Sequence, residues 1–318
     1  MNVKEWKSDL LLFLAAGIWG FAFVAQRAGM EHVGPFIFNA VRFALGSLTL
    51  APFLVMRMHR TASRKEALIP GDTDSRSSKM DKRQVLFFGL IAGLILFIGA
   101  SLQQVGLVYT TAGKAGFITG LYVILVPILG LFLRHIPRTG AWLGAMSAVI
   151  GLYLLSVTEH FTISPGDLLV LVSSLFWAMH VLIIGWLTQR IETLKLAFLQ
   201  FVSCSILSFL VAFTFETTTI RGLIDAAIPL LYGGILSVGV AYTLQVVAQR
   251  EAPPSHAAII LSLETVFAAF GGWLILDERL TMRGLIGCGF MLAGFVISQF
   301  GRKHHHKPGI MKEAGQNF

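Results

Sequence analysis

The chain has 318 residues, of which 55% are hydrophobic and only 13% are charged, and its mean hydropathy is +0.73. Soluble domains carry about a quarter charged residues, so this composition excludes a soluble globular protein with an ordinary charged shell. The net charge of +8 does not indicate nucleic-acid binding, because the basic residues lie in short stretches between apolar runs rather than along one polar face.

Ten apolar runs are long enough for helices that cross a bilayer, each of which needs about 20 residues. Gly and Pro mark most of the joints between them. The expected fold is therefore an all-α integral membrane protein of ten transmembrane helices, with no separate soluble domain. The expected spans are 10–29, 34–56, 85–108, 112–133, 140–157, 166–187, 195–215, 226–248, 255–276 and 282–300.

Two stretches outside the spans are polar. Residues 57–84 are rich in Arg, Lys and Ser and are expected to form a mobile loop, and residues 302–318 are expected to form a basic tail. The tail holds the run His304-His305-His306, which is more typical of a solvated basic tail than of a metal site. Most of the 25 Lys and Arg residues then lie on the side of the N-terminus, so both termini are expected in the cytoplasm of a cell with an inner (plasma) membrane.

The two halves of the chain resemble each other. One shift of the sequence places Trp19 on Trp177 and Arg42 on Gln200. A second, smaller shift places Gln103 on Gln245 and Ala115 on Ala257, and a shift larger than that by one residue places Gly144 on Gly287 and Gly151 on Gly294. The 57–84 insertion explains why the shift changes. Because each half has five spans, residues 1–157 and 158–301 are expected to form two repeats of opposite orientation, as in secondary transporters that work around a midplane site.

Three motifs carry a resemblance to a known family. Gly17-Ile18-Trp19-Gly20 resembles the first-helix signature of the drug/metabolite transporter superfamily in its EamA branch, and Val41-Arg42-Phe43 resembles that family's second helix. The stretch from Leu261 to Gly287 is similar to the closing motif of the second repeat. The resemblance covers nearly the whole chain and implies ten helices, two inverted repeats and export or exchange of metabolites such as amino acids.

The chain departs from that family at two positions. Thr265 stands where the family usually has Pro after the glutamate, and His135 stands where the first repeat should have an acid to match Glu278. A role that needs both acids symmetrically is therefore not expected here.

Ionisable residues inside a span are costly and are candidates for function. Glu264 in the ninth span either carries a proton or binds a cationic substrate, or else it is structural, paired with Arg42 or hydrogen-bonded to a neighbouring helix. The repeat places Tyr122 at its counterpart position. Arg42 in the second span either grips a substrate carboxylate, or pairs with an acid or reaches toward the headgroups. His180 either relays protons or is a satisfied buried histidine.

Aromatic and amide side chains from four spans are expected to share one pocket, because an apolar cavity with a few placed polar groups suits a small molecule. Lys114 and His256 are counterparts near the starts of the fourth and ninth spans, and they either line opposite mouths of a pathway or sit at the membrane interface. The Gly-x-x-x-Gly motifs at Gly89, Gly116 and Gly140 predict close helix packing or a homodimer contact. The expected pocket residues are Trp19, Trp177, Gln103, Tyr242 and Gln245.

The sequence therefore predicts a secondary transporter that exports a small, amino-acid-like metabolite or a drug by alternating access. No phosphate-binding Gly-rich loop and no Ser/His/Asp constellation is present in the sequence, so no cofactor, bound metal or enzymatic activity is expected, although coupling to protons is. The expected partners are the substrate and the lipid bilayer. Two alternatives stay open: a membrane-embedded enzyme that modifies lipid, and a non-transporting channel or sensor.

Overall fold

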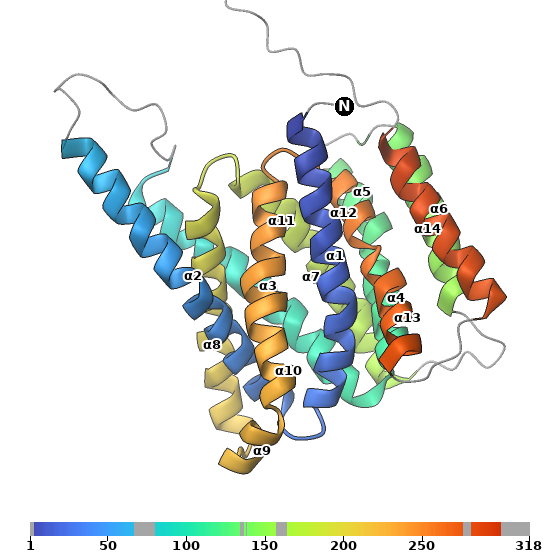
Figure 1. The fold of residues 1–318 in the computed structure, drawn as a ribbon, viewed down its shortest axis with the longest axis horizontal. Helices are drawn as coiled ribbons and strands as arrows, with labels where there is room; N and C mark the ends of the chain where they lie inside the picture. The colour runs from blue at the N-terminus through green and yellow to red at the C-terminus, as the bar shows by residue number, and fades with distance from the viewer. Residues whose placement is uncertain are drawn as a thin grey trace, which may run out of the picture.

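A computed structural model describes residues 3–66, 80–133, 137, 139–156, 164–275 and 281–299. Every regular element within these residues is helical (Figure 1). The elements are α1 (Val3–Gly29), α2 (Pro35–Glu66), α3 (Lys82–Tyr109), α4 (Ala112–Gly120), α5 (Tyr122–Phe132), α6 (Thr139–Ser156), α7 (Pro165–Leu187), α8 (Thr193–Phe215), α9 (Ile220–Asp225), α10 (Ala227–Leu231), η1 (Tyr232–Tyr242), α11 (Thr243–Ala248), α12 (Pro254–Leu261), α13 (Glu264–Ile275) and α14 (Met282–Gln299).

Each of the ten predicted runs falls on a helix or on a helix with a local break. Within the described residues, eight of these are long and apolar enough to cross a membrane, and the helices over Thr139–Leu154 and Met282–Ser298 are shorter apolar helices. The outer surface is rich in large apolar side chains, such as Phe132, Phe213 and Ile228, of which about four-fifths is exposed. Such a surface is stable in lipid rather than in water, so the chain is a multi-pass membrane protein.

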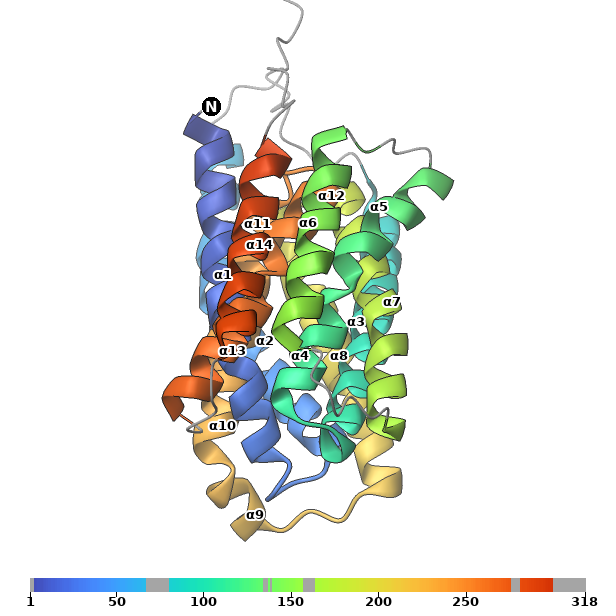
Figure 2. The same ribbon diagram turned by 90° about the vertical axis from the view of Figure 1, so that its right-hand side faces the viewer.

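The helices form one bundle whose long axes run in roughly the same direction (Figure 2). At the centre, α3 packs on α7 and α8, while α2 packs on α8 and η1. On one flank, α6 and α14 lie side by side and contact each other far more than any other helix (Figure 1). A Cβ at Gly151 would lie 2.5 Å from the carbonyl oxygen of Gly287, so this pair is held at backbone contact.

The expected loop at 57–84 is shorter than predicted. Helix α2 continues past the apolar run to Glu66, and α3 begins at Lys82 because Asp81 and Gln84 form a capping box at its start. A helix can leave the apolar layer without cost, because its backbone hydrogen bonds stay internal. Residues 67–79 and the tail with its His304-His305-His306 run lie outside the described residues.

The Gly-x-x-x-Gly motifs are used inside the bundle. Gly89 and Gly93 face Leu199 and Ser203 of α8, and Gly120 faces Thr265 of α13. Of the two alternatives, helix packing within one chain is the one that these contacts show.

Candidate functional site

Two helices break at counterpart positions near the middle of the bundle. The fourth span divides at Leu121, where the amide of Leu121 donates to the carbonyl of Ile118 (3.2 Å). The ninth span divides at Ser262 and Leu263, where the amide of Leu263 donates to the carbonyl of Ile260 (3.1 Å). These tightened turns start α5 at Tyr122 and α13 at Glu264. Interrupted spans in corresponding halves are a typical place for a transporter's binding site.

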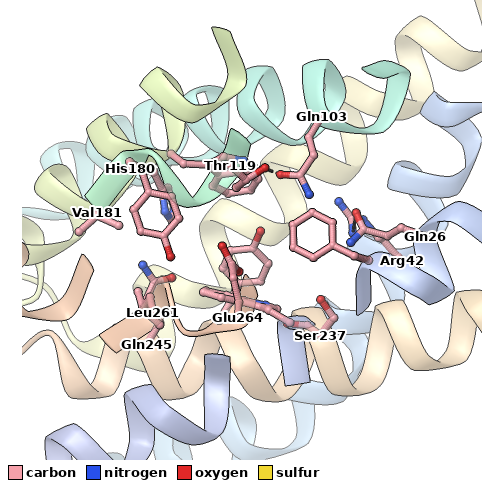
Figure 3. A pocket seen from close by; sticks show the side chains of 15 residues that line it. Gln26, Arg42, Gln103, Thr119, His180, Val181, Ser237, Gln245, Leu261 and Glu264 are labelled. Carbon is pink, nitrogen blue, oxygen red and sulfur yellow. Dashed lines mark hydrogen bonds between the residues drawn. The ribbon is translucent and has the colours of Figure 1, made fainter. Parts of the chain in front are cut away.

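A cavity with about 490 Å³ of space between its lining atoms lies at these breaks (Figure 3). All nine candidate residues of the sequence analysis line it, which places them together but does not test their role. The lining residues are Trp19, Phe23, Gln26, Arg42, Gln103, Thr119, Tyr122, Trp177, His180, Val181, Ser237, Tyr242, Gln245, Leu261 and Glu264.

Ten of the lining residues form five counterpart pairs under the two sequence shifts. The two members of each pair thus line the cavity from equivalent positions in the two halves of the chain. The pairs are Trp19 with Trp177, Phe23 with Val181, Gln103 with Gln245, Thr119 with Leu261, and Tyr122 with Glu264. We call these ten residues the paired lining. The other five, Gln26, Arg42, His180, Ser237 and Tyr242, are the unpaired lining.

Arg42 is buried in the cavity wall, with 2% of its surface exposed. Its Nη1 donates to Oε1 of Gln26 (2.8 Å), and its guanidinium lies over the ring of Phe43 at 5.0 Å. Among the described residues, no carboxylate comes within 4.0 Å of it and its Nε has no hydrogen-bond partner. Within the described residues, Arg42 therefore does not pair with an acid, and its burial places it in the bundle rather than toward the headgroups. Gln26 and the aromatic ring stabilise the charge instead, which leaves a donor for a ligand.

Glu264 lies beside Tyr122, and 4% of each residue is exposed. Oε1 of Glu264 and the Tyr122 hydroxyl interact with each other across the two helix breaks, but neither forms a hydrogen bond of good geometry within the part of the chain that the structure describes. The alternative that Glu264 is paired with Arg42 is thus excluded for these residues. Buried polar groups in proteins are nearly always satisfied, so these two atoms are available to water or to a bound molecule.

The signature around Trp19 now has a physical reason. A Cβ at Gly20 would lie 2.6 Å from the carbonyl oxygen of Glu264, so only Gly lets α1 approach the start of α13. This approach holds Trp19 in the cavity wall, where its Nε1 donates to the carbonyl of Ser237 (3.1 Å). Its counterpart Trp177 donates to Oε1 of Gln103 (2.6 Å).

Tyr242 is the centre of an aromatic cluster. Its ring packs edge-on against Trp19 with centroids 4.6 Å apart and is stacked with Trp177 at 6.1 Å. His180 meets it at 6.2 Å. Nε2 of His180 lies 2.8 Å from Oε1 of Gln200, while its Nδ1 has no partner among the described residues, so the histidine is only half satisfied.

Six lining residues were not predicted from the sequence. Four of them form two counterpart pairs, Phe23 with Val181 and Thr119 with Leu261. The internal repeat would therefore have indicated each of these residues once its counterpart was known. Gln26 is a polar residue of α1 that lines the cavity, and the carbonyl of Ser237 accepts a hydrogen bond from Trp19.

Two further candidates lie elsewhere. Lys114 contacts Asp167 and His256 contacts Asp9, and neither Lys114 nor His256 is among the residues that line the cavity. Within the described residues, no group of three or more His, Cys, Asp or Glu could hold a metal ion. His135 and Glu278 lie outside the described residues, so their match is not tested.

Comparison with known proteins decides the family. The model of the EamA-like transporter family matches residues 6–157 and again residues 164–299. The chain belongs to this family. The resemblance noted in the sequence to the EamA branch of the drug/metabolite transporters is thus confirmed, and this EamA protein is a membrane transporter.

Named relatives agree. The chain is 33% identical over 297 residues to an uncharacterized transporter of Archaeoglobus fulgidus, a match covering 93% of this chain and 87% of the relative. It is 22% identical to the uncharacterized inner membrane transporter YedA of Escherichia coli K12, covering 92% and 90% of the two chains. A solved crystal structure at 17% identity shares the fold, with a TM-score of 0.71 over 92% of this chain and 96% of the other.

Proposed function

We propose that this EamA transporter is a secondary carrier that exports a small amino-acid-like metabolite across the inner membrane by alternating access. The observation that carries the proposal is the central cavity, which is lined from both halves of the chain at two broken helices and holds buried polar atoms without partners. A site of this kind needs a ligand or water to satisfy those atoms.

Alternating access requires two related halves, and the packing supports this arrangement of ten helices. If the halves are related by a two-fold axis, any contact between them should recur with its partners exchanged. Gly144 lies against the carbonyl of Gly294, and their counterparts Gly287 and Gly151 meet in the same way. The family model also matches the chain twice, in tandem.

The lining indicates the substrate's chemistry. Arg42 offers a free guanidinium donor for a carboxylate. Glu264 offers a buried carboxyl group that accepts a hydrogen bond from, or pairs with, an ammonium group, and the cluster around Tyr242 offers an apolar and aromatic surface for a side chain. Together these groups favour a zwitterion with an apolar or aromatic side chain over a lipid or a large drug.

Orientation and direction belong to the same proposal. The excess of Lys and Arg on the side of the N-terminus supports cytoplasmic termini. Export follows the resemblance to the EamA branch, and the inner membrane follows the name of the Escherichia coli relative.

The test is efflux from proteoliposomes loaded with amino acids, nucleobases and small cationic drugs, read by mass spectrometry. Wild-type vesicles should lose zwitterionic amino acids selectively. Counter-substrate on the far side should accelerate the loss, which a channel would not show. Loss of none of the pooled amino acids would refute the substrate class.

Glu264→Gln tests the coupling role in the same vesicles, with and without a pH gradient. The substitution removes the buried carboxylate, and we expect efflux to fall at least tenfold, which is about 1.4 kcal/mol. The matched control is Glu251→Gln in an exposed turn, which should transport normally. Normal transport by Glu264→Gln at every pH would show that Glu264 has no such role.

A further inference from the structure

Two buried acid–base pairs join helices outside the central cavity. Nε2 of His256 in α12 lies 2.9 Å from Oδ1 of Asp9 in α1, and 6% and 7% of these side chains are exposed. Nζ of Lys114 in α4 lies 3.4 Å from Oδ2 of Asp167 in α7, with 25% and 4% exposed. Acidic groups are rarely buried in membrane helices unless they have a task.

The two pairs occupy counterpart positions. The shift that places Trp19 on Trp177 also places Asp9 on Asp167, and the shift that places Gln103 on Gln245 also places Lys114 on His256. Each pair therefore makes the same contact, between the first span of one half and the fourth span of the other. We call this contact between the halves a joint. Chance would not supply an acid and a base at both copies of one joint.

A neighbouring contact recurs in the same way. The Ser8 hydroxyl donates to the carbonyl of Ala248 (2.9 Å), next to Asp9. The counterparts of these residues, Gly166 and Gly106, also touch, since a Cβ at Gly166 would lie 2.5 Å from the carbonyl oxygen of Gly106. The geometry of the joint is thus conserved between the halves, not only its residue types.

The two pairs lie at opposite ends of the bundle. In Figures 1 and 2, α1 starts at the upper end and α12 lies above α13. Asp9 lies in the second turn of α1 and His256 in the first turn of α12, so their pair belongs to that end. Helix α4 lies below α5, so Lys114, in the first turn of α4, is near the lower end with its partner Asp167. The cavity lies between them, at the breaks that end α4 and α12.

We infer that Asp9–His256 and Lys114–Asp167 are positioning residues that hold the two ends of the transport pathway shut in turn. The inference rests on the proposed alternating access. Each pair attaches a short helix, α12 or α4, to the other half of the chain, and the break at the cavity lets that helix turn when its pair separates. Substrate then leaves by the end whose pair is broken.

The two ends of the bundle differ in the contacts that close them. At the end near the N-terminus, the Asp9–His256 pair is tight, Nδ1 of His256 lies 3.1 Å from the Ser298 hydroxyl, and Nε2 of Gln249 donates to the carbonyl of Val181 (2.8 Å). At the other end the lysine is partly exposed and its pair is longer, and the Thr110 hydroxyl also donates to Oδ1 of Asp167. Asp9–His256 is therefore the tighter of the two acid–base pairs.

Asp167 has a second, structural task, because it forms a capping box with Ser164 at the start of α7. Replacing Asp167 would disturb that helix start. The base, Lys114, is therefore the residue to change at this end, and Asp9 the residue to change at the other.

The experiment measures access to the cavity from each side of the membrane. The full-length protein carries Cys288→Ser and a reporter, Val181→Cys, in the cavity wall, and Cys204 remains because it is fully buried. Membrane vesicles of both orientations receive an impermeant maleimide without substrate. Asp9→Asn should raise the labelling rate at least threefold from the side of the N-terminus and lower it from the other side, and Lys114→Gln should do the reverse.

Matched variants separate a gate from a merely structural contact. His256→Lys and Lys114→His each give one joint the base of its counterpart, so both joints keep an acid and a base and labelling should stay within twofold of the parent. His256→Gln is a second way to open the N-terminal end if Asp9→Asn does not fold. A variant that has merely lost structure would have a lower melting temperature, and its labelling would change in the same way from both sides of the membrane.

The inference is overturned if Asp9→Asn and Lys114→Gln shift the ratio of labelling from the two sides in the same direction, or leave it unchanged. Labelling needs no substrate, so the two proposals fail separately. Opposite changes in the labelling ratio without efflux of any amino acid would support the two gating pairs and refute the proposed substrate class. Efflux of amino acids with equal changes in the labelling ratio would support the proposed carrier and refute the gating pairs.

Discussion

The two halves of the chain contribute differently to the cavity between them. In the paired lining, Trp19 and Trp177 place the same group at equivalent points, as do Gln103 and Gln245, and only Glu264 carries a charge that its counterpart lacks. The unpaired lining has no such matches: the first half adds Arg42 with Gln26, and the second half adds Tyr242, His180 and Ser237. A symmetric frame can rock between two equivalent arrangements, whereas a single substrate of fixed shape needs unequal groups around it. The matched groups therefore serve movement, and the unequal groups, which include Glu264, serve selectivity.

The third span of each half shows the same contrast. In the first half it is one regular helix, α3. In the second half it is divided into α10, η1 and α11, and η1 is a π-helix of eleven residues that ends at Tyr242. Such wide turns are rare and often occur at functional sites. Here the π-helix belongs to the half that supplies the aromatic centre of the cavity.

The largest expected effect comes from making the unpaired lining symmetric. Arg42→Gln gives the first half the residue that its counterpart position, Gln200, already has. Removing a desolvated charge that binds a substrate carboxylate should cost about 2–5 kcal/mol, and we expect transport in the efflux assay to fall on the order of a hundredfold.

The control for this substitution is Arg221→Gln, since the Arg221 side chain is 91% exposed. The converse change, Gln200→Arg, should not restore transport in the Arg42→Gln background, because Gln200 is bonded to His180 and does not line the cavity. Full activity of Arg42→Gln would show that the charge of Arg42 does not determine which substrate is transported.

The symmetric frame predicts equal effects at counterpart glycines. A Cβ at Gly151 would lie 2.5 Å from the carbonyl oxygen of Gly287, and one at Gly294 would lie 2.6 Å from that of Gly144. Gly151→Ala and Gly294→Ala should each destabilise the protein by about 1–3 kcal/mol, and should lower its melting temperature in detergent by similar amounts.

Gly289→Ala is the matched control, because a Cβ there meets no atom within 4 Å and the more helix-favouring Ala should be neutral or stabilising. Clearly unequal melting temperatures for Gly151→Ala and Gly294→Ala would contradict a two-fold relation between α6 and α14.

The smallest effect is expected at the two tryptophans of the paired lining. Trp177→Phe keeps an aromatic side chain, though a smaller one, and removes the donor to Gln103, and Trp19→Phe likewise removes the donor to the Ser237 carbonyl. Each loses one neutral hydrogen bond, worth about 1 kcal/mol, so the substrate concentration at half-maximal efflux should rise several-fold in both. A loss confined to one of the two tryptophans would show that the paired lining is unequal in function.

The sequence predicted the spans and most of the cavity because both depend on residue type. Long apolar runs are helices in lipid, and the few polar residues within them, such as Arg42, Gln103 and Glu264, face inward. The breaks at Leu121 and Leu263 were not predicted, since they shift hydrogen bonds by one residue without a Pro at the break. The π-helix had no sequence signal either. The pairing of Arg42 with Glu264 was a wrong alternative, because Gln26 had not been recognised as the arginine's partner.

Helices α6 and α14 contact each other far more than they contact any other helix, and glycines hold the two backbones together. Close packing of this kind resists deformation. Lateral pressure from the lipid on this flank therefore acts on the two helices as one unit, and reaches the rest of the bundle through the few contacts that the pair makes with it.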